Sequence, residues 1–220
     1  MATERSTILL ATRSSGKLRE LKEIFSDFDF DVVGLSAAGI PYSDAEEVIE
    51  SYATFEENAL AKGRYFHDLT GMPTIADDSG LAVDALGGAP GVLSKRFSGR
   101  TGLTGAALDE ANNERLMREL QHIDAERASR GEEPASRSAR YMCVAAYVGS
   151  RGEMIRTGTI EGRVIDQPRG NGGFGYDAYV EVSELGGTMA EAGWEIKAQV
   201  SHRGRAFRAL LPALREIGWA

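Results

Sequence analysis

The stretch Ile75–Phe97, IADDSGLAVDALGGAPGVLSKRF, brings two adjacent carboxylates to the end of an apolar run and follows them with small residues and glycines. We expect a strand that ends at Asp77-Asp78-Ser79-Gly80 and holds acidic oxygens at a sheet edge, where they could grip a hard cation or a water. The later glycines would let the backbone approach a ligand closely. The alternative is a capped turn, because Asp and Ser bond their own backbone and Gly supplies positive φ.

Composition narrows the class of protein. The chain has 220 residues, of which 42% are apolar and 26% charged, and its net charge is -8. It has no run of about 18 apolar residues that could span a bilayer, and its acidity disfavours a nucleic-acid partner. The N-terminal segment has too short an apolar stretch before Thr12 for a signal peptide. We therefore expect a cytoplasmic protein with no membrane partner, folded as a single domain over residues 1–220 with two lobes and no separable linker.

A strand, a polar loop and a helix follow one another near the N-terminus. Thr7–Ala11 is typical of a buried strand, and apolar residues at helical spacing begin at Leu18. The loop Thr12–Lys17 would offer backbone N–H groups, the positive end of a helix dipole and an ammonium group to a phosphate. The same residues also fit an ordinary N-cap followed by a lysine, since no Walker A pattern is present.

An acidic loop, Ser43–Ser51, precedes a second predicted helix. Thr54 and Glu57 have the spacing of a capping box, and the helix is expected to run to about His67. Acids before a helix are usually solvated partners of its dipole. One of them could instead share a metal with the acidic pair at Asp77.

The middle of the chain predicts a mixed α/β sheet. We expect a helix over Thr104–Gln121 and a surface loop over Asp124–Arg137. Two long strand-like runs follow, Arg140–Val148 and Met154–Ile165, and long strands between helices are typical of such a sheet. The single cysteine, Cys143, lies in the first run and is expected in the core.

The glycine loop, Gly170–Asp177, joins flexible backbone to two aromatic rings and an acid. A planar base could stack on Phe174 or Tyr176 while Asp177 accepts hydrogen bonds. The alternative is a turn whose aromatic residues fill the core.

The closing helix is expected to begin at Ser201. His202 and Arg203 would then lie in its first turn, where the dipole disfavours cations. Both are suitable donors to a purine carbonyl or a phosphate; the alternative is an ordinary surface position.

Five blocks occur in order along nearly the whole chain. They are T-x-S-x-x-K at Thr12–Lys17, T-F-E-E-N-A at Thr54–Ala59, A-D-D-S-G-L-A-V-D-A-L-G-G-A-P-G-V at Ala76–Val92, G-G-F-G-Y-D at Gly172–Asp177 and S-H-R-G at Ser201–Gly204. In this order they resemble the inosine/xanthosine triphosphate pyrophosphatase family. The resemblance implies a homodimeric cytoplasmic α/β enzyme with a long central mixed β-sheet flanked by helices, in two lobes with the active-site cleft between them. It implies Mg²⁺-dependent hydrolysis of ITP, dITP and XTP to the monophosphate and pyrophosphate, which removes these nucleotides from the pool.

The resemblance also implies roles for matching residues. Asp78 would be the catalytic acid and general base and would share the metal with Glu50, with Asp77 as a further candidate ligand. The glycine loop would stack the base, and His202 with Arg203 would read its 6-oxo edge, so that the 6-amino group of ATP is rejected. The full substrate-binding set is Thr12, Arg13, Ser14, Ser15, Gly16, Lys17, Lys62, Ser79, Phe174, Gly175, Tyr176, Asp177, Lys197, His202 and Arg203.

Four positions depart from the family pattern. Ser14 replaces its usual Asn, Tyr52 a glycine, Ala178 a proline and Ile196 a glutamate. These departures leave two alternatives open: a diverged relative that makes a monophosphate from dATP or another specific nucleotide, and a nucleotide-binding protein that no longer hydrolyses its ligand.

Overall fold

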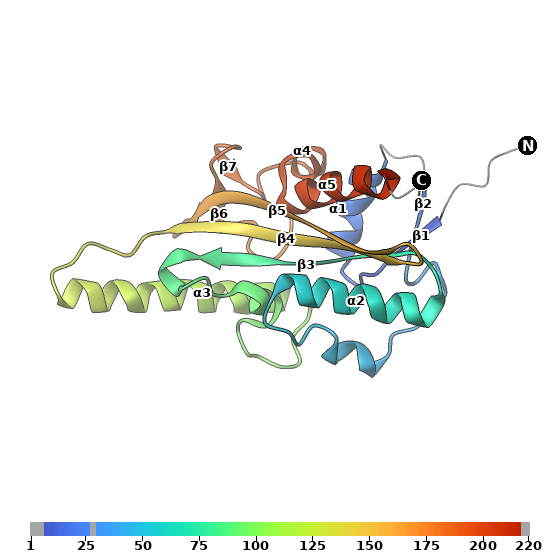
Figure 1. The fold of residues 1–220 in the computed structure, drawn as a ribbon. Helices are drawn as coiled ribbons and strands as arrows, with labels where there is room; N and C mark the ends of the chain where they lie inside the picture. The colour runs from blue at the N-terminus through green and yellow to red at the C-terminus, as the bar shows by residue number, and fades with distance from the viewer. Residues whose placement is uncertain (1–6, 27–29, 217–220) are drawn as a thin grey trace, which may run out of the picture. The chain divides into compact units, whose positions relative to one another are not determined.

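The computed structural model describes residues 7–26 and 30–216. Its seven strands form one sheet in the order β2-β1-β3-β4-β5-β6-β7 (Figure 1). Strand β1 runs parallel to β2 and β3, whereas β6 runs antiparallel to β5 and β7, so the predicted mixed sheet is confirmed. The elements are β1 (Thr7–Leu10), α1 (Ser15–Phe25), β2 (Asp31–Gly34), η1 (Asp44–Val48), α2 (Phe55–Thr70), β3 (Thr74–Val83), η2 (Asp84–Leu86), η3 (Gly91–Arg96), α3 (Gly105–Ser129), β4 (Ser138–Gly149), β5 (Gly152–Val164), β6 (Val180–Val182), β7 (Gly187–Thr188), α4 (Trp194–Val200) and α5 (His202–Glu216).

The chain divides into two compact units. The first contains Met1–Asp78, Cys143–Thr159 and Ala198–Ala220, and the second contains Ser79–Met142 and Ile160–Lys197. Strands β3, β4 and β5 contribute residues to both units.

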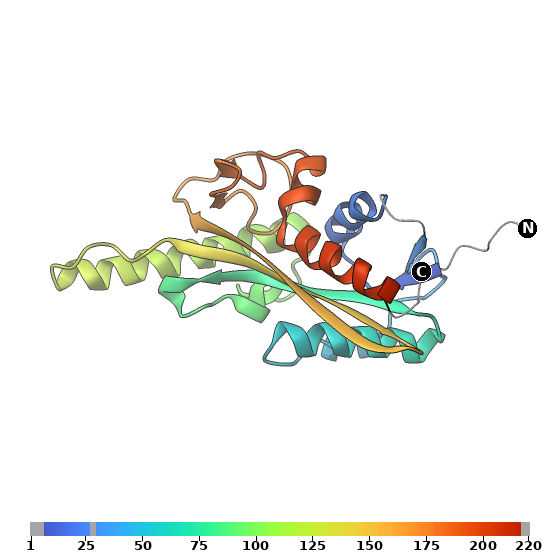
Figure 2. The ribbon, with the colours of Figure 1, turned by 45° about the horizontal axis from the view of Figure 1, so that its top comes forward.

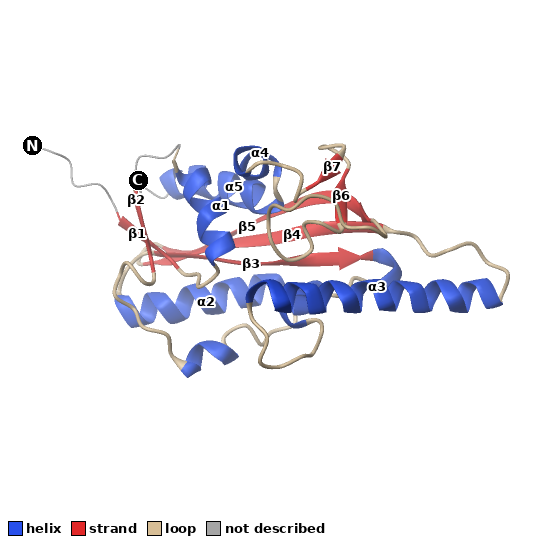
Figure 3. Ribbon diagram, turned by 180° about the vertical axis from the view of Figure 1, so that it is seen from behind, coloured by secondary structure: helices blue, strands red, loops and turns tan. Residues whose placement is uncertain are grey.

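The side chains of β1 alternate between the two faces of the sheet and form part of the hydrophobic core on each face. Ile8 and Leu10 pack with apolar residues of α1 and α5, while Leu9 and Ala11 pack with Phe66 of α2. Successive side chains of a strand point to opposite faces, so each face of the sheet receives its own cover. Figures 1 and 3 show α1 and α5 on one face of this unit and α2 on the other, and Figure 2 shows α5 lying beside α1.

The predicted caps at Thr54 and Ser201 are confirmed, and the N-cap that was one alternative for the Thr12–Lys17 loop is Ser14. Ser14 caps α1 by accepting a hydrogen bond from the Lys17 N–H, and Thr54 caps α2 by accepting one from the Glu57 N–H. The Ser201 hydroxyl caps α5 by accepting the Gly204 N–H at 2.9 Å.

The structure corrects the expectation that the strand ends at the acidic pair. Strand β3 continues from Thr74 through Asp77 and Asp78 to Val83, and all ten of its residues except Ser79 are buried. A capped turn is therefore wrong as well. The backbone stays extended because β3 continues beside β4 in the sheet, where a turn would break the ladder.

The predicted loop over Asp124–Arg137 is also partly wrong. Helix α3 continues to Ser129, because the chain offers no Gly or Pro to stop it before Gly131.

Cys143 is fully buried, as predicted. None of the helices in the described ranges is both long and apolar enough to cross a membrane. The first six residues, which enter the signal-peptide prediction, lie outside those ranges.

Candidate active site

The acidic pair lies where β1 stops. The register of β1 with β3 ends at Leu10 opposite Ile75, so the next residues of β3 have no β1 partner. Because β1 and β3 are parallel, the loop Thr12–Lys17 leaves β1 beside the part of β3 that carries Asp77 and Asp78. The acids thus lie just beyond the carboxyl end of β1 and not at the edge of the sheet, because β3 is an interior strand.

Asp77 faces the α1 and α5 side of the sheet, among cations. Its Oδ2 atom lies 2.9 Å from Lys17 Nζ and 3.2 Å from Arg203 Nε. Burial by itself would raise the pKa of Asp77, but Lys17, Arg203 and Lys62 together hold it well below its usual range. The carboxylate therefore stays charged, while burial raises the pKa of the neighbouring Cys143 thiol. This keeps Cys143 a thiol rather than a nucleophile.

Glu20 of α1 completes this buried network, and the sequence analysis missed it. Its two carboxylate oxygens accept hydrogen bonds of 2.5 Å from Arg203 Nη1 and from the Ser201 hydroxyl. Its side chain is fully buried, as Asp77 is, and that of Arg203 is 2% exposed. The signal for Glu20 was its place three residues after Lys17 and four before the buried Ile24, on one helix face.

Asp78 points to the opposite face, toward α2. Asn58 Nδ2 donates to Asp78 Oδ2 at 3.0 Å, and the same fully buried amide bonds the N–H and the carbonyl of Tyr52. Asn58 thus ties the loop that carries Glu50 to the acid. Burial raises the pKa of Asp78, with a further contribution from Glu50, while Lys17, Lys62 and Asn58 act in the other direction. A carboxylate with a raised pKa is suited to accept a proton.

Lys62 bridges the two acidic segments. Its ammonium group pairs with Glu50 and donates to the main-chain carbonyl of Asp77. Burial lowers the pKa of Lys62, but Glu50, Asp77 and Asp78 outweigh that effect and raise it, so the side chain remains charged. Lys17 and Lys62 therefore bring two cations to a carboxylate pair, which suits a polyanionic ligand.

The donor set fits Mg²⁺ in one respect. Asp78 and Glu50 are close enough to interact electrostatically, and Mg²⁺ is commonly held by one or two carboxylates together with substrate phosphates and waters. Residues 7–26 and 30–216 contain no group of three or more acidic, His or Cys side chains arranged around a metal. A bound cation would thus depend on oxygens from the ligand and solvent.

The remaining predicted phosphate residues lie in the Thr12–Lys17 segment, except for Ser79 in β3. Thr12 is buried and its hydroxyl accepts the Ser14 N–H at 3.2 Å, while Ser15 and Gly16 open α1. Arg13 points elsewhere, to Glu46 at 2.7 Å and to the carbonyls of Ile40 and Pro41. Ser79 follows Asp78 in β3 and is half-buried.

In the second unit, the glycine loop holds an aromatic ring over a buried ion pair. Lys197 pairs with Asp177 and lies 4.5 Å from the centroid of Phe174, while Asp177 Oδ2 also accepts the Phe174 N–H at 2.8 Å. Tyr176 is buried, and its hydroxyl donates to the Ser94 carbonyl at 2.9 Å. Its ring fills the interior of this unit, the alternative left open by the sequence, whereas Phe174 is partly exposed.

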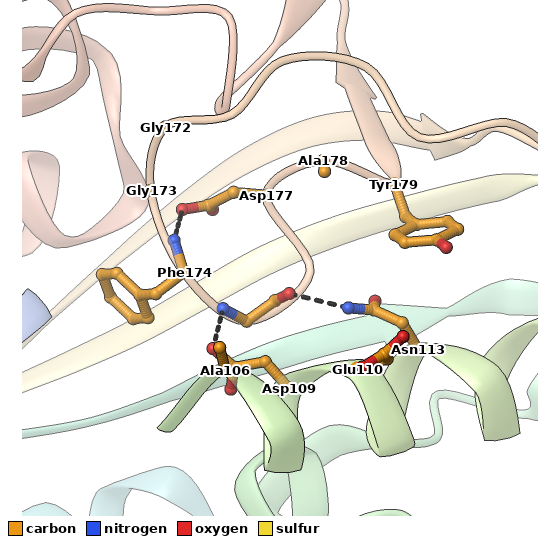
Figure 4. A pocket seen from close by; sticks show the side chains of 11 residues that line it. Ala106, Asp109, Glu110, Asn113, Gly172, Gly173, Phe174, Asp177, Ala178 and Tyr179 are labelled. Atoms are coloured by element: carbon orange, nitrogen blue, oxygen red, sulfur yellow. Dashed lines mark hydrogen bonds between the residues drawn. The ribbon is translucent and has the colours of Figure 1, made fainter. Parts of the chain in front are cut away.

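A cavity of about 270 Å³ lies on the α3 side of this loop. It is lined by Ala106, Asp109, Glu110 and Asn113 of α3 and by residues 172–175 and 177–179, which include the departure Ala178 (Figure 4). Lys197 is not among the residues that line it. The other departures do not line it: Tyr52 and Ile196 are each half exposed, and Ser14 caps α1.

His202 and Arg203 occupy the first turn of α5 and are both buried. Arg203 and Ser201 join the network of Glu20 and Asp77. Because His202 and Arg203 are both buried, the surface alternative for this segment is wrong.

Comparison with known proteins gives consistent results. The model of the Ham1 family matches residues 8–213. A protein of Geobacter sulfurreducens named dITP/XTP pyrophosphatase is 43% identical over 213 residues, which is 96% of each chain. A protein of the same name from Frankia alni is 43% identical over 211 residues, covering 96% of this chain and 98% of that one. Among solved structures, a HAM1 protein from Coxiella burnetii has a TM-score of 0.78 at 33% identity, covering 96% of this chain and 99% of its own.

Proposed function

The chain belongs to the Ham1 family, and from this we propose that it is a nucleoside triphosphate pyrophosphatase that hydrolyses dITP, ITP and XTP to the monophosphate and pyrophosphate. The observation that carries the proposal is the polar cluster at the end of β1, where Asp77 and Asp78 lie among Lys17 and Lys62. Relatives that share 43% of the sequence over nearly its full length bear the name of this activity.

The first unit supplies the groups that the hydrolysis needs. Attack of water on the α-phosphorus builds negative charge on the phosphate oxygens, and Lys17 and Lys62 would neutralise part of it. Asp78 would orient the water and accept its proton, a role that its raised pKa favours. Asn58 would hold the acid in place through its 3.0 Å bond to Oδ2.

We propose that Asp78 and Glu50 hold Mg²⁺, with Asp77 as a further candidate ligand. When bound, the ion would neutralise phosphate charge and lower the pKa of a coordinated water. Asp77 Oδ1 is buried and accepts no hydrogen bond from the described residues, which leaves it available to a cation. Asp77 Oδ2, in contrast, is already bonded to Lys17 and Arg203.

The family resemblance assigns the purine base to Phe174 and its neighbours and the 6-oxo edge of the base to His202 and Arg203. The partly exposed ring of Phe174 would stack on the purine, with Asp177 and Lys197 beside it. His202 and Arg203 would donate to the 6-oxo group, which adenine lacks. The bonds of Arg203 to Asp77 and Glu20 would fix its orientation for that task.

We further propose that the enzyme works as a homodimer in the cytoplasm, on the strength of the family resemblance. Light scattering after size exclusion tests the first part: a mass near twice 23.7 kDa supports a dimer, and a mass near 23.7 kDa contradicts it.

Release of pyrophosphate is the test of the activity. ITP, dITP, XTP, GTP, ATP and dATP would each be supplied with Mg²⁺, and the wild type compared with Asp78→Asn. Asp68→Asn is the matched control, because Asp68 is an exposed carboxylate of α2. Loss of a general base lowers kcat by about 10² to 10⁴-fold. We expect that loss for Asp78→Asn and none for Asp68→Asn.

Each outcome separates the candidates. Fast release from ITP, dITP and XTP with little from ATP supports the proposal. Preference for dATP or another nucleotide would instead indicate a diverged relative, and binding without release from any nucleotide would indicate a protein that has lost hydrolysis. Omission of Mg²⁺ should abolish release if the metal assignment holds.

A further inference from the structure

Both backbone polar groups of Gly175, its N–H and its carbonyl, are bonded to side chains of α3. Asp109 Oδ2 accepts the Gly175 N–H at 2.8 Å, and Asn113 Nδ2 donates to the Gly175 carbonyl at 2.9 Å, as the dashed lines in Figure 4 show. We propose that Asp109 and Asn113 are positioning residues that set the base-stacking geometry of the glycine loop. Nothing in the sequence blocks singled out either residue.

The two hydrogen bonds restrain a loop whose glycines would otherwise leave its backbone flexible. Gly173 and Gly175 flank Phe174 and have φ values of 77° and 64°, in the region where glycine is favoured. Glycines lose more conformational freedom on ordering than other residues, so an untethered loop would sample many orientations of the ring between them. The loop from Gly170 to Asp177 also contains no helix or strand to hold it.

The two hydrogen bonds act on the residue next to Phe174, which carries the stacking ring. Gly175 follows Phe174 directly, and two residues later Asp177 accepts the Phe174 N–H. Asp177 is in turn paired with Lys197, whose ammonium lies over the Phe174 ring. Holding the Gly175 backbone in place therefore restrains the Phe174 ring, which is also linked to Asp177 and Lys197.

Packing does not explain the attachment. The 270 Å³ cavity lies on the α3 side of the loop and is lined in part by α3 itself, so the contact between them is incomplete. Asp109 and Asn113 are four residues apart and thus lie on one face of the helix. Asn113 is 6% exposed, although asparagine is mostly an exposed residue. The two hydrogen bonds to the Gly175 backbone orient the loop, and they contribute little buried apolar surface.

This inference rests on the proposed function, since it assigns the Phe174 ring to the purine. The two bonds act on the base and not on the phosphates. We therefore expect their loss to raise KM for ITP, while inhibition by inorganic tripolyphosphate, which carries no base, stays the same.

The experiment compares five proteins: the wild type, Asp109→Ala, Asp109→Asn, Asn113→Ala and the control Glu114→Ala. Asparagine at 109 retains a carbonyl that can accept the Gly175 N–H, so Asp109→Asn is the conservative rescue. Glu114 lies on the same helix but is exposed and pairs with Arg100. Thermal unfolding establishes that each variant folds, and kcat, KM for ITP and Ki for tripolyphosphate are then measured.

We expect KM for ITP to rise about fivefold to tenfold in each alanine variant, the effect of losing one hydrogen bond. Asp109→Asn and Glu114→Ala should stay within about twofold of the wild type, and Ki for tripolyphosphate should not change in any variant. Unchanged KM in both alanine variants would overturn the inference, as would equal losses of ITP and tripolyphosphate binding. A wild type that turns over no ITP would instead remove the proposed function, and the inference with it. Unfolding of an alanine variant leaves the decision to Asn113→Asp, which removes the donor at nearly constant volume and should raise KM at least as much.

Discussion

Replacing Glu20 with glutamine should destabilise this protein far more than its place on a surface helix suggests. The native network places the cations Lys17 and Arg203 beside the carboxylates Asp77 and Glu20. Its charges sum to zero, and the side chains of Asp77 and Glu20 are fully buried. Glutamine preserves the shape but leaves two cations against one carboxylate.

The magnitude follows from that imbalance. Breaking a buried ion pair by removing one partner costs about 3–5 kcal/mol, because the other charge stays buried and unpaired. Glutamine still offers a carbonyl oxygen to Arg203 or to the Ser201 hydroxyl, so we expect a loss near the lower end, about 3 kcal/mol. For a chain of this size, that loss corresponds to a fall in Tm of about 6–12 °C.

Urea unfolding followed by circular dichroism is the assay, with Glu23→Gln as the matched control. Glu23 lies on the same helix but is exposed, and its loss should change the free energy of unfolding by less than about 0.5 kcal/mol. The m-value should be the same for both variants, since neither changes the surface buried on folding. A Glu20→Gln protein within 1 kcal/mol of Glu23→Gln would refute the argument that the four charges act as one buried unit.

Three further perturbations test other parts of the structure. Asn58→Ala should lower kcat by about tenfold with little change in KM, because Asp78 loses the donor that orients it, and steady-state kinetics on ITP would show this. Gly158→Ala should destabilise the fold by at least about 2 kcal/mol in urea, since the new Cβ would lie 2.2 Å from the His202 carbonyl oxygen; a near-neutral result would contradict the close packing of β5 on α5. The pKa of Asp77 is depressed in the folded state, so its charge stabilises the protein above about pH 4 and that stabilisation is lost as the pH falls below it. The difference in unfolding free energy between wild type and Asp77→Asn should accordingly shrink by about 1 kcal/mol from pH 6 to pH 3, and a constant difference would argue against the depressed pKa.

Features that depend on residues close together in the sequence could be predicted from it. Thr54 and Ser201 each cap a helix as predicted, and Ser14 is the N-cap that the Thr12–Lys17 segment allowed, because a cap joins residues only two or three positions apart. The strand before Thr12 and the helix after it followed from apolar spacing, which depends on local geometry alone. Strands β4 and β5 were recognised for the same reason, as was the mixed sheet.

The course of the chain at the acidic pair depended on the sheet. Asp77, Asp78 and Ser79 have the composition of a turn, yet they are extended because β3 continues beside β4. Extension places adjacent acids on opposite faces, so Asp77 meets α1 and α5 while Asp78 meets α2. The different surroundings of the two acids follow from the extended conformation of β3 and could not be predicted from their adjacent positions in the sequence.

The partners of buried charges and of loop backbone groups depend on the tertiary structure. Glu20 meets Arg203 across 183 positions of sequence, and Asp109 meets Gly175 across 66. A local pattern carries no information on such separations, whereas a buried charge or peptide must be satisfied by whatever group the fold brings to it. Local sequence patterns were sufficient to predict helix caps, the main strands and the blocks that mark the family. The sheet and the helices packed on it determined which acid faces which cations and which helix holds the glycine loop.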